Sequence, residues 1–211
     1  MEIKLNIKDR LTEEEASELV KLGEKLEKGE LFSKDEEEAL SLYVLAAKQG
    51  DASAFGKMGR IYLRTGEKKR AVMYLKKSAA MGDTEAMGLL GNLYMRDGDL
   101  ENASMCFEPA AKAGDVEGMY GLGMVLEMCE ETERAIEWYR KAGIKGHPDA
   151  MDALGNHYEN NDNADLALFW YRQAAEKGNN HAARAIKRIE GSQKDVDLAG
   201  DANKILPLLL G

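Results

Sequence analysis

The sequence predicts an all-α fold: a right-handed α–α superhelix (solenoid) of paired antiparallel helices, with about five 32-residue repeats and terminal caps. One observation is a set of glycines at a constant step of 32 residues, namely Gly50, Gly82, Gly114, Gly146 and Gly178. Another is a recurring helical pattern of apolar residues, seen in "FGKMGRIYL", "MGLLGNLYM", "MYGLGMVLE" and "MDALGNHYE". A second helical segment follows in each unit, with one alanine column made of Ala71, Ala103, Ala135 and Ala167. Because one hairpin cannot bury its apolar face alone, such a period indicates stacked neighbours.

The repeat boundaries follow from this register. We expect an N-terminal arm at residues 1–11, a degenerate leading repeat at 12–50, full repeats at 51–82, 83–114, 115–146 and 147–178, and a partial repeat with a C-terminal cap at 179–211. In the leading repeat, capping-box patterns at Thr12 to Glu15 and Ser33 to Glu36 predict helices at about 12–28 and 35–48. Near the chain ends, apolar residues such as Ile3 and Leu209 are expected to cover the open ends of the stack.

Each full repeat contains signals for where its helices begin and end. The terminal glycine is expected to adopt the left-handed conformation that ends the second helix. The residue after it is an N-cap candidate for the next first helix at Asp51, Asp83 and Asp115. A glycine inside a helix costs about 1 kcal/mol relative to alanine. We therefore expect a large residue of the paired or neighbouring helix to pack against the backbone at Gly59, Gly91, Gly123 and Gly155.

The repeat at 115–146 departs most from the shared pattern. Its first helix contains three glycines, and Leu126 stands where other repeats have tyrosine. The preceding second helix contains Pro109, which removes a backbone hydrogen bond and should kink that helix. We expect local flexibility in this region.

The amino-acid composition of the chain restricts the kinds of partner that it is expected to bind. The net charge of −9 argues against non-specific nucleic-acid binding, whose affinity comes mostly from Lys and Arg. Residues 51–82 nevertheless carry +6, while the rest of the chain carries −15. Cys106 and Cys129 lack metal-ligand spacing and are expected to be reduced thiols. The opening "MEIKLNIKDR" has no continuous apolar stretch, so we expect a cytoplasmic protein that does not bind membranes.

The segments "LGNLY", "LGNHY", "ERAIEWYRKAG" and "LALFWYRQAAEKG" resemble the Sel-1-like repeat family, a branch of the tetratricopeptide-like superfamily. The resemblance covers about residues 35 to 190. One departure is the turn between paired helices, as in "LRTGEKKRA", which is four residues shorter than is usual in that family. The resemblance implies an adaptor that holds other proteins on a concave surface lined by the first helices.

If the first helices line a groove, the positions one and five residues after each packing glycine face it. These columns place Arg60, Arg64, Asn92 and Arg96 together with Lys57. Guanidinium groups bind carboxylates and phosphates in bidentate fashion, so these residues could anchor an acidic group of a partner. The alternative is that they are solvated surface side chains.

The same columns continue with Met124, Met128 and Asn156, and Tyr120 lies nearby. Deformable methionine side chains suit an adaptable apolar stretch in mid-groove, although plain core packing is the alternative. Farther along, acidic side chains predict an acidic end of the groove that orients a ligand peptide: Glu117, Glu127, Asp149, Asp152 and Glu159. Solubility and head-to-tail self-association are the alternatives.

No common catalytic motif is present, so the sequence predicts a protein that is not an enzyme, with no cofactor and no metal. His147, His157 and His181 fall at unrelated points of the repeat and are expected to be structural or surface residues. The predicted function is a protein–protein interaction scaffold or adaptor that binds an extended peptide or partner helix. The alternative is a structural protein that forms homo-oligomers through its apolar termini.

Overall fold

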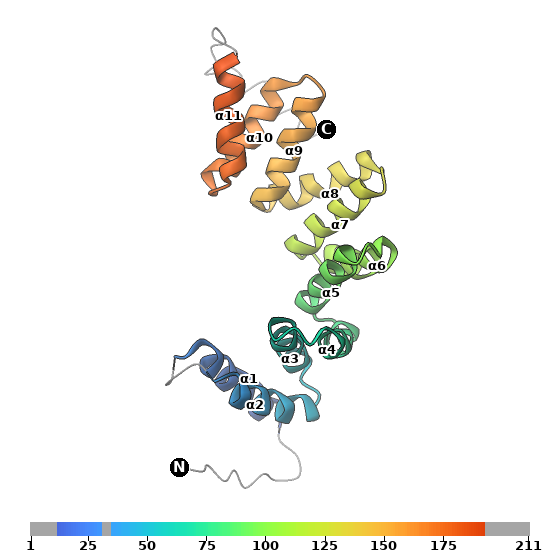
Figure 1. Ribbon diagram of the computed structural model, residues 1–211, viewed down its shortest axis with the longest axis vertical. Helices are drawn as coiled ribbons and strands as arrows, with labels where there is room; N and C mark the ends of the chain where they lie inside the picture. Colours follow the sequence, from blue (N-terminus) through green and yellow to red (C-terminus); the bar gives the residue numbers. More distant parts are fainter. Residues whose placement is uncertain (1–11, 31–34, 193–211) are drawn as a thin grey trace. The chain divides into compact units, whose positions relative to one another are not determined.

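The computed structural model describes residues 12–30 and 35–192, and every regular element among them is a helix (Figure 1). The chain divides into two compact units, Met1–Pro109 and Ala110–Gly211, which are described separately. The helices are α1 (Glu13–Lys28), α2 (Glu36–Lys48), α3 (Ala52–Arg64), α4 (Lys68–Ala80), α5 (Thr84–Arg96), α6 (Leu100–Lys112), α7 (Val116–Met128), α8 (Thr132–Ile144), α9 (Pro148–Asn160), α10 (Ala164–Glu176) and α11 (Asn180–Ser192). The predicted all-α fold of paired helices is confirmed in these residues.

In the first unit, consecutive helices pack against one another from α1 to α5. One apolar core joins α1, α2 and α3 around the fully buried Tyr43 and Met58. A second core joins α4 and α5 around Leu75 and Leu90. In the second unit, α7 packs on α8, α8 on α9, and α10 on both α9 and α11. Within each unit, the hairpins therefore pack against their neighbours, as the period predicts.

The glycines inside the first helices are sites of close helix packing, as expected. A Cβ atom on Gly59 would lie 2.6 Å from Leu75, and one on Gly91 would lie 2.6 Å from Phe107. In the second unit, a Cβ atom at Gly123 or Gly155 would lie 2.5 Å from the ring of Tyr139 or Tyr171, respectively. The large residue comes from the paired second helix every time. The leading hairpin has the same contact, between Gly23 of α1 and Tyr43 of α2.

The predicted helix ends are also confirmed. Gly50 and its four equivalents have φ between 88° and 97°. The side chains of Asp51, Asp83 and Asp115 accept backbone N–H groups of the following first turn. Thr12 and Glu15 form the expected capping box of α1.

The start of α2 differs from the prediction. Its N-cap is Asp35, which accepts the N–H of Glu38 at 2.9 Å. The predicted capping box from Ser33 to Glu36 is therefore wrong, because Glu36 is the first residue of the helix and cannot occupy its third position. An aspartate caps a helix as well as a serine does, so the helix itself forms where expected.

The region around Pro109 is helical. Helix α6 continues through Pro109 to Lys112, and the boundary between the two compact units falls at this proline. A Cβ atom on Gly118 of α7 would lie 2.7 Å from that of Ala110, so this glycine permits close packing. The expected flexibility here stays a prediction. The arm at 1–11 and the predicted C-terminal cap beyond Ser192 lie outside the described residues.

Candidate functional site

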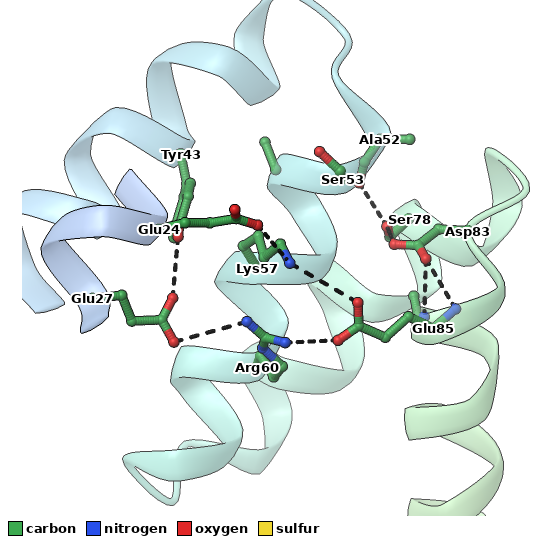
Figure 2. A network of polar contacts seen from close by, with 12 residues as sticks. Glu24, Glu27, Tyr43, Ala52, Ser53, Lys57, Arg60, Ser78, Asp83 and Glu85 are labelled. Atoms are coloured by element: carbon green, nitrogen blue, oxygen red, sulfur yellow. Dashed lines mark hydrogen bonds and ion pairs between the residues drawn. The ribbon is translucent and has the colours of Figure 1, made fainter. Parts of the chain in front are cut away.

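The basic residues of α3 form the centre of a polar network (Figure 2). We call Lys57, Arg60 and Arg64 the α3 cationic cluster. Residues three and four apart lie on the same side of a helix, so the three cations share one face. That face meets glutamates from both neighbouring repeats. The Arg60 guanidinium lies 2.8 Å from Glu85 on α5 and 3.9 Å from Glu27 on α1.

The contacts of the cluster with α1 and α2 are the more buried ones. The Glu27 side chain is 10% exposed, accepts the hydroxyl of Tyr43 at 3.1 Å and lies 2.9 Å from Arg64. Arg64 also pairs with Glu36 at 3.1 Å. The Lys57 ammonium lies 2.8 Å from Glu24, and this hydrogen bond is the main cause that lowers the pKa of the Glu24 carboxyl.

The predicted acid-binding residues therefore divide into two groups. Arg60 and Arg64 share Glu27, so their mutual repulsion is compensated within the protein. Asn92 and Arg96 lie exposed on α5. Arg96 borders a hollow of about 240 Å³ whose other lining residues include Leu63, Leu93 and the ion pair of Lys68 with Asp97.

The predicted mid-groove residues are on α7, in the second unit. Tyr120 is half-buried, and its ring stacks on His147 with centroids 4.4 Å apart. Burial is the main cause that raises the pKa of Tyr120, and nearby acidic residues add to it. Met124 is half-buried, whereas Met128 is 55% exposed. Asn156 on α9 is half-buried, and its side-chain amide lies 2.8 Å from the hydroxyl of the buried Tyr171.

The predicted acidic residues all contact other side chains of the second unit. Glu127 accepts the hydroxyl of Tyr139 at 2.7 Å, and Glu159 accepts that of Tyr171 at 2.9 Å. The remaining pairs join a first helix to the start of the next one. They are Glu117 with His147 at 3.3 Å, Asp149 with Asn179 at 2.9 Å and Asp152 with His181 at 2.9 Å.

One residue has a role that the sequence interpretation missed. His147 does not fall at an unrelated point of the repeat, because it occupies the N-cap column of Asp51, Asp83 and Asp115. Its Nδ1 accepts the N–H of Ala150 at 3.2 Å, and the residue is 6% exposed. The broader expectation of a structural histidine is confirmed for His147. Its position 32 residues after Asp115 was the available signal.

A second missed relation links two columns of the repeat. Where the second helix buries a tyrosine, the residue four positions after the packing glycine is a glutamate that accepts its hydroxyl. The pairs are Glu27 with Tyr43, Glu127 with Tyr139 and Glu159 with Tyr171. Where the buried residue is Leu75 or Phe107, which has no hydroxyl, the same position is Leu63 or Met95. A buried hydroxyl needs a partner, so the two columns change together.

The described residues show no other kind of site. Among residues 12–30 and 35–192, no three histidine, cysteine, aspartate or glutamate side chains gather in a way that could hold a metal ion. Within the same ranges, no helix combines the length and apolar composition needed to cross a bilayer. Cys106 and Cys129 are free thiols, and burial is the main cause that raises the pKa of Cys106.

Two families of helical repeat match the chain. Residues 19–51, 116–147 and 148–179 match the Sel1 repeat, and residues 52–81 and 84–113 match the tetratricopeptide repeat. The three Sel1 segments are those with a tyrosine–glutamate pair, and the two tetratricopeptide segments are those with Leu75 and Phe107. None of the curated proteins matches the sequence.

Several solved structures share the fold. A Sel1 repeat protein from Oxalobacter formigenes is 22% identical, with 91% of this chain and 84% of that one covered and a TM-score of 0.77. The protective antigen c5321 of uropathogenic Escherichia coli, which displays an SLR fold, is 25% identical with a TM-score of 0.77. The alignment covers 92% of this chain but 44% of c5321. YrrB, a tetratricopeptide repeat protein with an unusual peptide-binding site, is 22% identical, with coverage of 82% and 88% and a TM-score of 0.54.

Proposed function

The chain belongs to the Sel1-like repeat family of the tetratricopeptide-like superfamily, and we propose that it holds an acidic protein segment against the face formed by its first helices. Repeat proteins of this class generally mediate protein–protein interactions and typically act as scaffolds without catalysis.

The proposal is supported by the different roles of two neighbouring residues on each first helix, one in packing and one at the surface. The packing glycine of each first helix lies against the second helix of its pair. The residue that directly follows this glycine in the sequence lies beside the contact. Over successive repeats that position holds side chains that are exposed or partly exposed: Arg60, Asn92, Met124 and Asn156. Within each unit, such side chains on neighbouring first helices suit an extended segment, because each repeat adds another contact.

Each unit would contribute a different chemistry. In the first unit, Arg60 and Arg96 favour acidic groups, since guanidinium groups match carboxylate geometry, and Asn92 offers an amide beside them. In the second unit, Tyr120, Met124 and Met128 offer half-buried or exposed apolar surface, and Asn156 offers an amide. YrrB is described as having a peptide-binding site, which supports the same use of the fold here. A cytoplasmic location belongs to the same proposal and agrees with two free thiols.

The test compares charge changes on the two helix types. The first-helix variant is Asn92→Glu with Arg96→Glu, both exposed on α5. The matched control is Lys69→Glu with Met105→Glu, exposed on the second helices α4 and α6, with the same total change in charge. Captured proteins are measured by quantitative mass spectrometry after pull-down from a lysate of the source cells. The first-helix variant should lose most of at least one partner that the control retains. Equal capture by both variants would refute a first-helix binding face.

The alternative function, self-assembly through the apolar termini, concerns segments outside the described residues. Light scattering of the full chain beside a version limited to residues 12–192 separates the two functions. If the full chain is an oligomer that the shortened version cannot form, self-assembly gains support. A monomer in both cases leaves the scaffold as the remaining proposal.

A further inference from the structure

We propose that Glu85 regulates the binding face by occupying it: Lys57 and Arg60 form a carboxylate receptor, and an acidic side chain of the partner must displace Glu85 to bind there. This inference rests on the proposed function and deepens it. Arg64, by contrast, is assigned a structural role, because Glu27 and Glu36 hold it from two sides.

The receptor is defined by how one carboxylate meets two cations (Figure 2). The Oε1 atom of Glu85 lies 2.8 Å from a terminal nitrogen of Arg60, and its Oε2 atom lies 4.0 Å from the Nζ atom of Lys57. Lys57 and Arg60 are three residues apart on α3, so they project from the same side of the helix. Any carboxylate placed there would meet the same pair of positive charges.

The two cations are held in place independently of Glu85. Lys57 pairs with Glu24 at 2.8 Å and its side chain is only 17% exposed. Arg60 faces Glu27, which is itself fixed by Tyr43. Side chains that are already ordered lose little conformational freedom when a ligand binds, so this receptor is preorganised.

Glu85 is the residue of this network whose carboxylate can be displaced from Lys57 and Arg60. Its side chain is 54% exposed, compared with 10% for Glu27. Helix α5 does not depend on that carboxylate, because the cap of α5 is Asp83, which accepts the N–H of Glu85 at 3.0 Å. Exposed ion pairs contribute little net stability, so exchanging one carboxylate for another costs little.

Repeat stacking does not require this ion pair. The position of Arg60 is occupied in the next three repeats by Asn92, Met124 and Asn156, none of which can pair with an acidic side chain as a cation does. In the second unit, the repeats that carry Met124 and Asn156 nevertheless stack on their neighbours, since α8 packs on α9 and α10 packs on α11. The pair of Arg60 with Glu85 is therefore specific to one interface, as expected of a binding device and not of a general stacking contact.

The contacts at the receptor indicate a carboxylate as its ligand. A hollow of about 190 Å³ borders the receptor and is lined by Glu24, Glu27, Lys28, Lys57 and Arg60. The two glutamates supply fixed negative charge beside the cations. The group that occupies the receptor in this structure is itself a carboxylate, that of Glu85, so the spacing of Lys57 and Arg60 fits such a group. The partner chemistry we assign is therefore an aspartate or glutamate side chain in a peptide.

The experiment is an NMR titration of the full chain with an acetylated and amidated tetra-glutamate peptide, read at the backbone amide groups of residues 57–64 on α3, which every variant retains. Removing the internal competitor with Glu85→Gln should tighten the Kd up to about fivefold, the factor expected for losing one exposed ion pair. The control Glu67→Gln makes the same change in net charge and breaks another exposed pair, that of Glu67 with Arg70 at the start of the second helix α4. It should leave the Kd unchanged within about twofold.

Adding Arg60→Gln to Glu85→Gln should abolish the gain in affinity for the peptide. Titration of Glu85→Gln with inorganic phosphate should show no gain in affinity. The regulatory role of Glu85 is overturned if Glu85→Gln and Glu67→Gln change the Kd equally, if the gain in affinity survives Arg60→Gln, or if Glu85→Gln raises the affinity for phosphate more than the affinity for the peptide. Glu85→Ala, checked for folding by circular dichroism, repeats the test with a smaller side chain. These outcomes are distinct from failure of the proposed function, which is judged by capture with the Asn92→Glu, Arg96→Glu variant.

Discussion

Gly88 and Gly91 lie one turn apart on α5 and have opposite surroundings. A Cβ atom at Gly88 would have no neighbour within 4 Å, whereas one at Gly91 would lie 2.6 Å from the ring of Phe107. Both residues are inside a helix, so propensity alone favours alanine equally at each. The difference between them isolates the packing role of the glycine column.

We expect Gly88→Ala to raise the free energy of unfolding by up to about 1 kcal/mol, the helix-propensity difference. Gly91→Ala should lower it by about 1 to 3 kcal/mol, because Phe107 is fully buried and cannot move away freely. Urea denaturation followed by circular dichroism measures both. Equal effects of the two substitutions would show that the glycine column has no packing role.

At the scale of the helix pair, the buried tyrosine and its glutamate behave as one exchangeable unit. The pair of Glu127 with Tyr139 occupies the positions that Met95 and Phe107 occupy one repeat earlier. Burial is the main cause that raises the pKa of Tyr139, and its hydrogen bond to Glu127 adds to it. The hydroxyl therefore stays protonated and acts as a donor.

We expect Glu127→Met alone to destabilise the second unit by about 1 kcal/mol, since the tyrosine hydroxyl loses its acceptor. Combining it with Tyr139→Phe recreates the neighbouring repeat's pair and should recover most of that loss. A double-mutant cycle in urea measures the coupling energy. Glu133→Met, at an exposed position of α8, is the control and should change stability by less than about 0.5 kcal/mol. Strictly additive single effects would argue against a coupled pair.

Local signals explain why most elements could be predicted. Helix ends at Gly50 or Asp51 depend on backbone conformation and capping within a few residues, which the sequence displays directly. The partners of Arg60 and Arg64 could not be predicted in the same way. Glu85 and Glu27 lie in neighbouring repeats, and whether long side chains meet across that gap depends on how the hairpins stack. The tyrosine–glutamate relation was readable from the aligned columns but was missed.

At the scale of the whole molecule, the chain combines two kinds of repeat whose packing glycines occupy equivalent positions. The Sel1 segments bury tyrosines at residues 43, 139 and 171, and the tetratricopeptide segments bury Leu75 and Phe107. The leading hairpin has four more residues between its packing glycine and the opposing side chain than the later ones. The shared feature is the glycine contact that orients each first helix.

The central claim is that partners bind to the first helices. Hydrogen–deuterium exchange tests it most directly, on the full chain with and without a partner identified by the pull-down. We expect slower exchange on binding in first helices, above all α3 and α5, with little change in α4, α8 and α10, since binding stabilises the contacted elements against local opening. Protection confined to second helices or to residues 193–211 would contradict it.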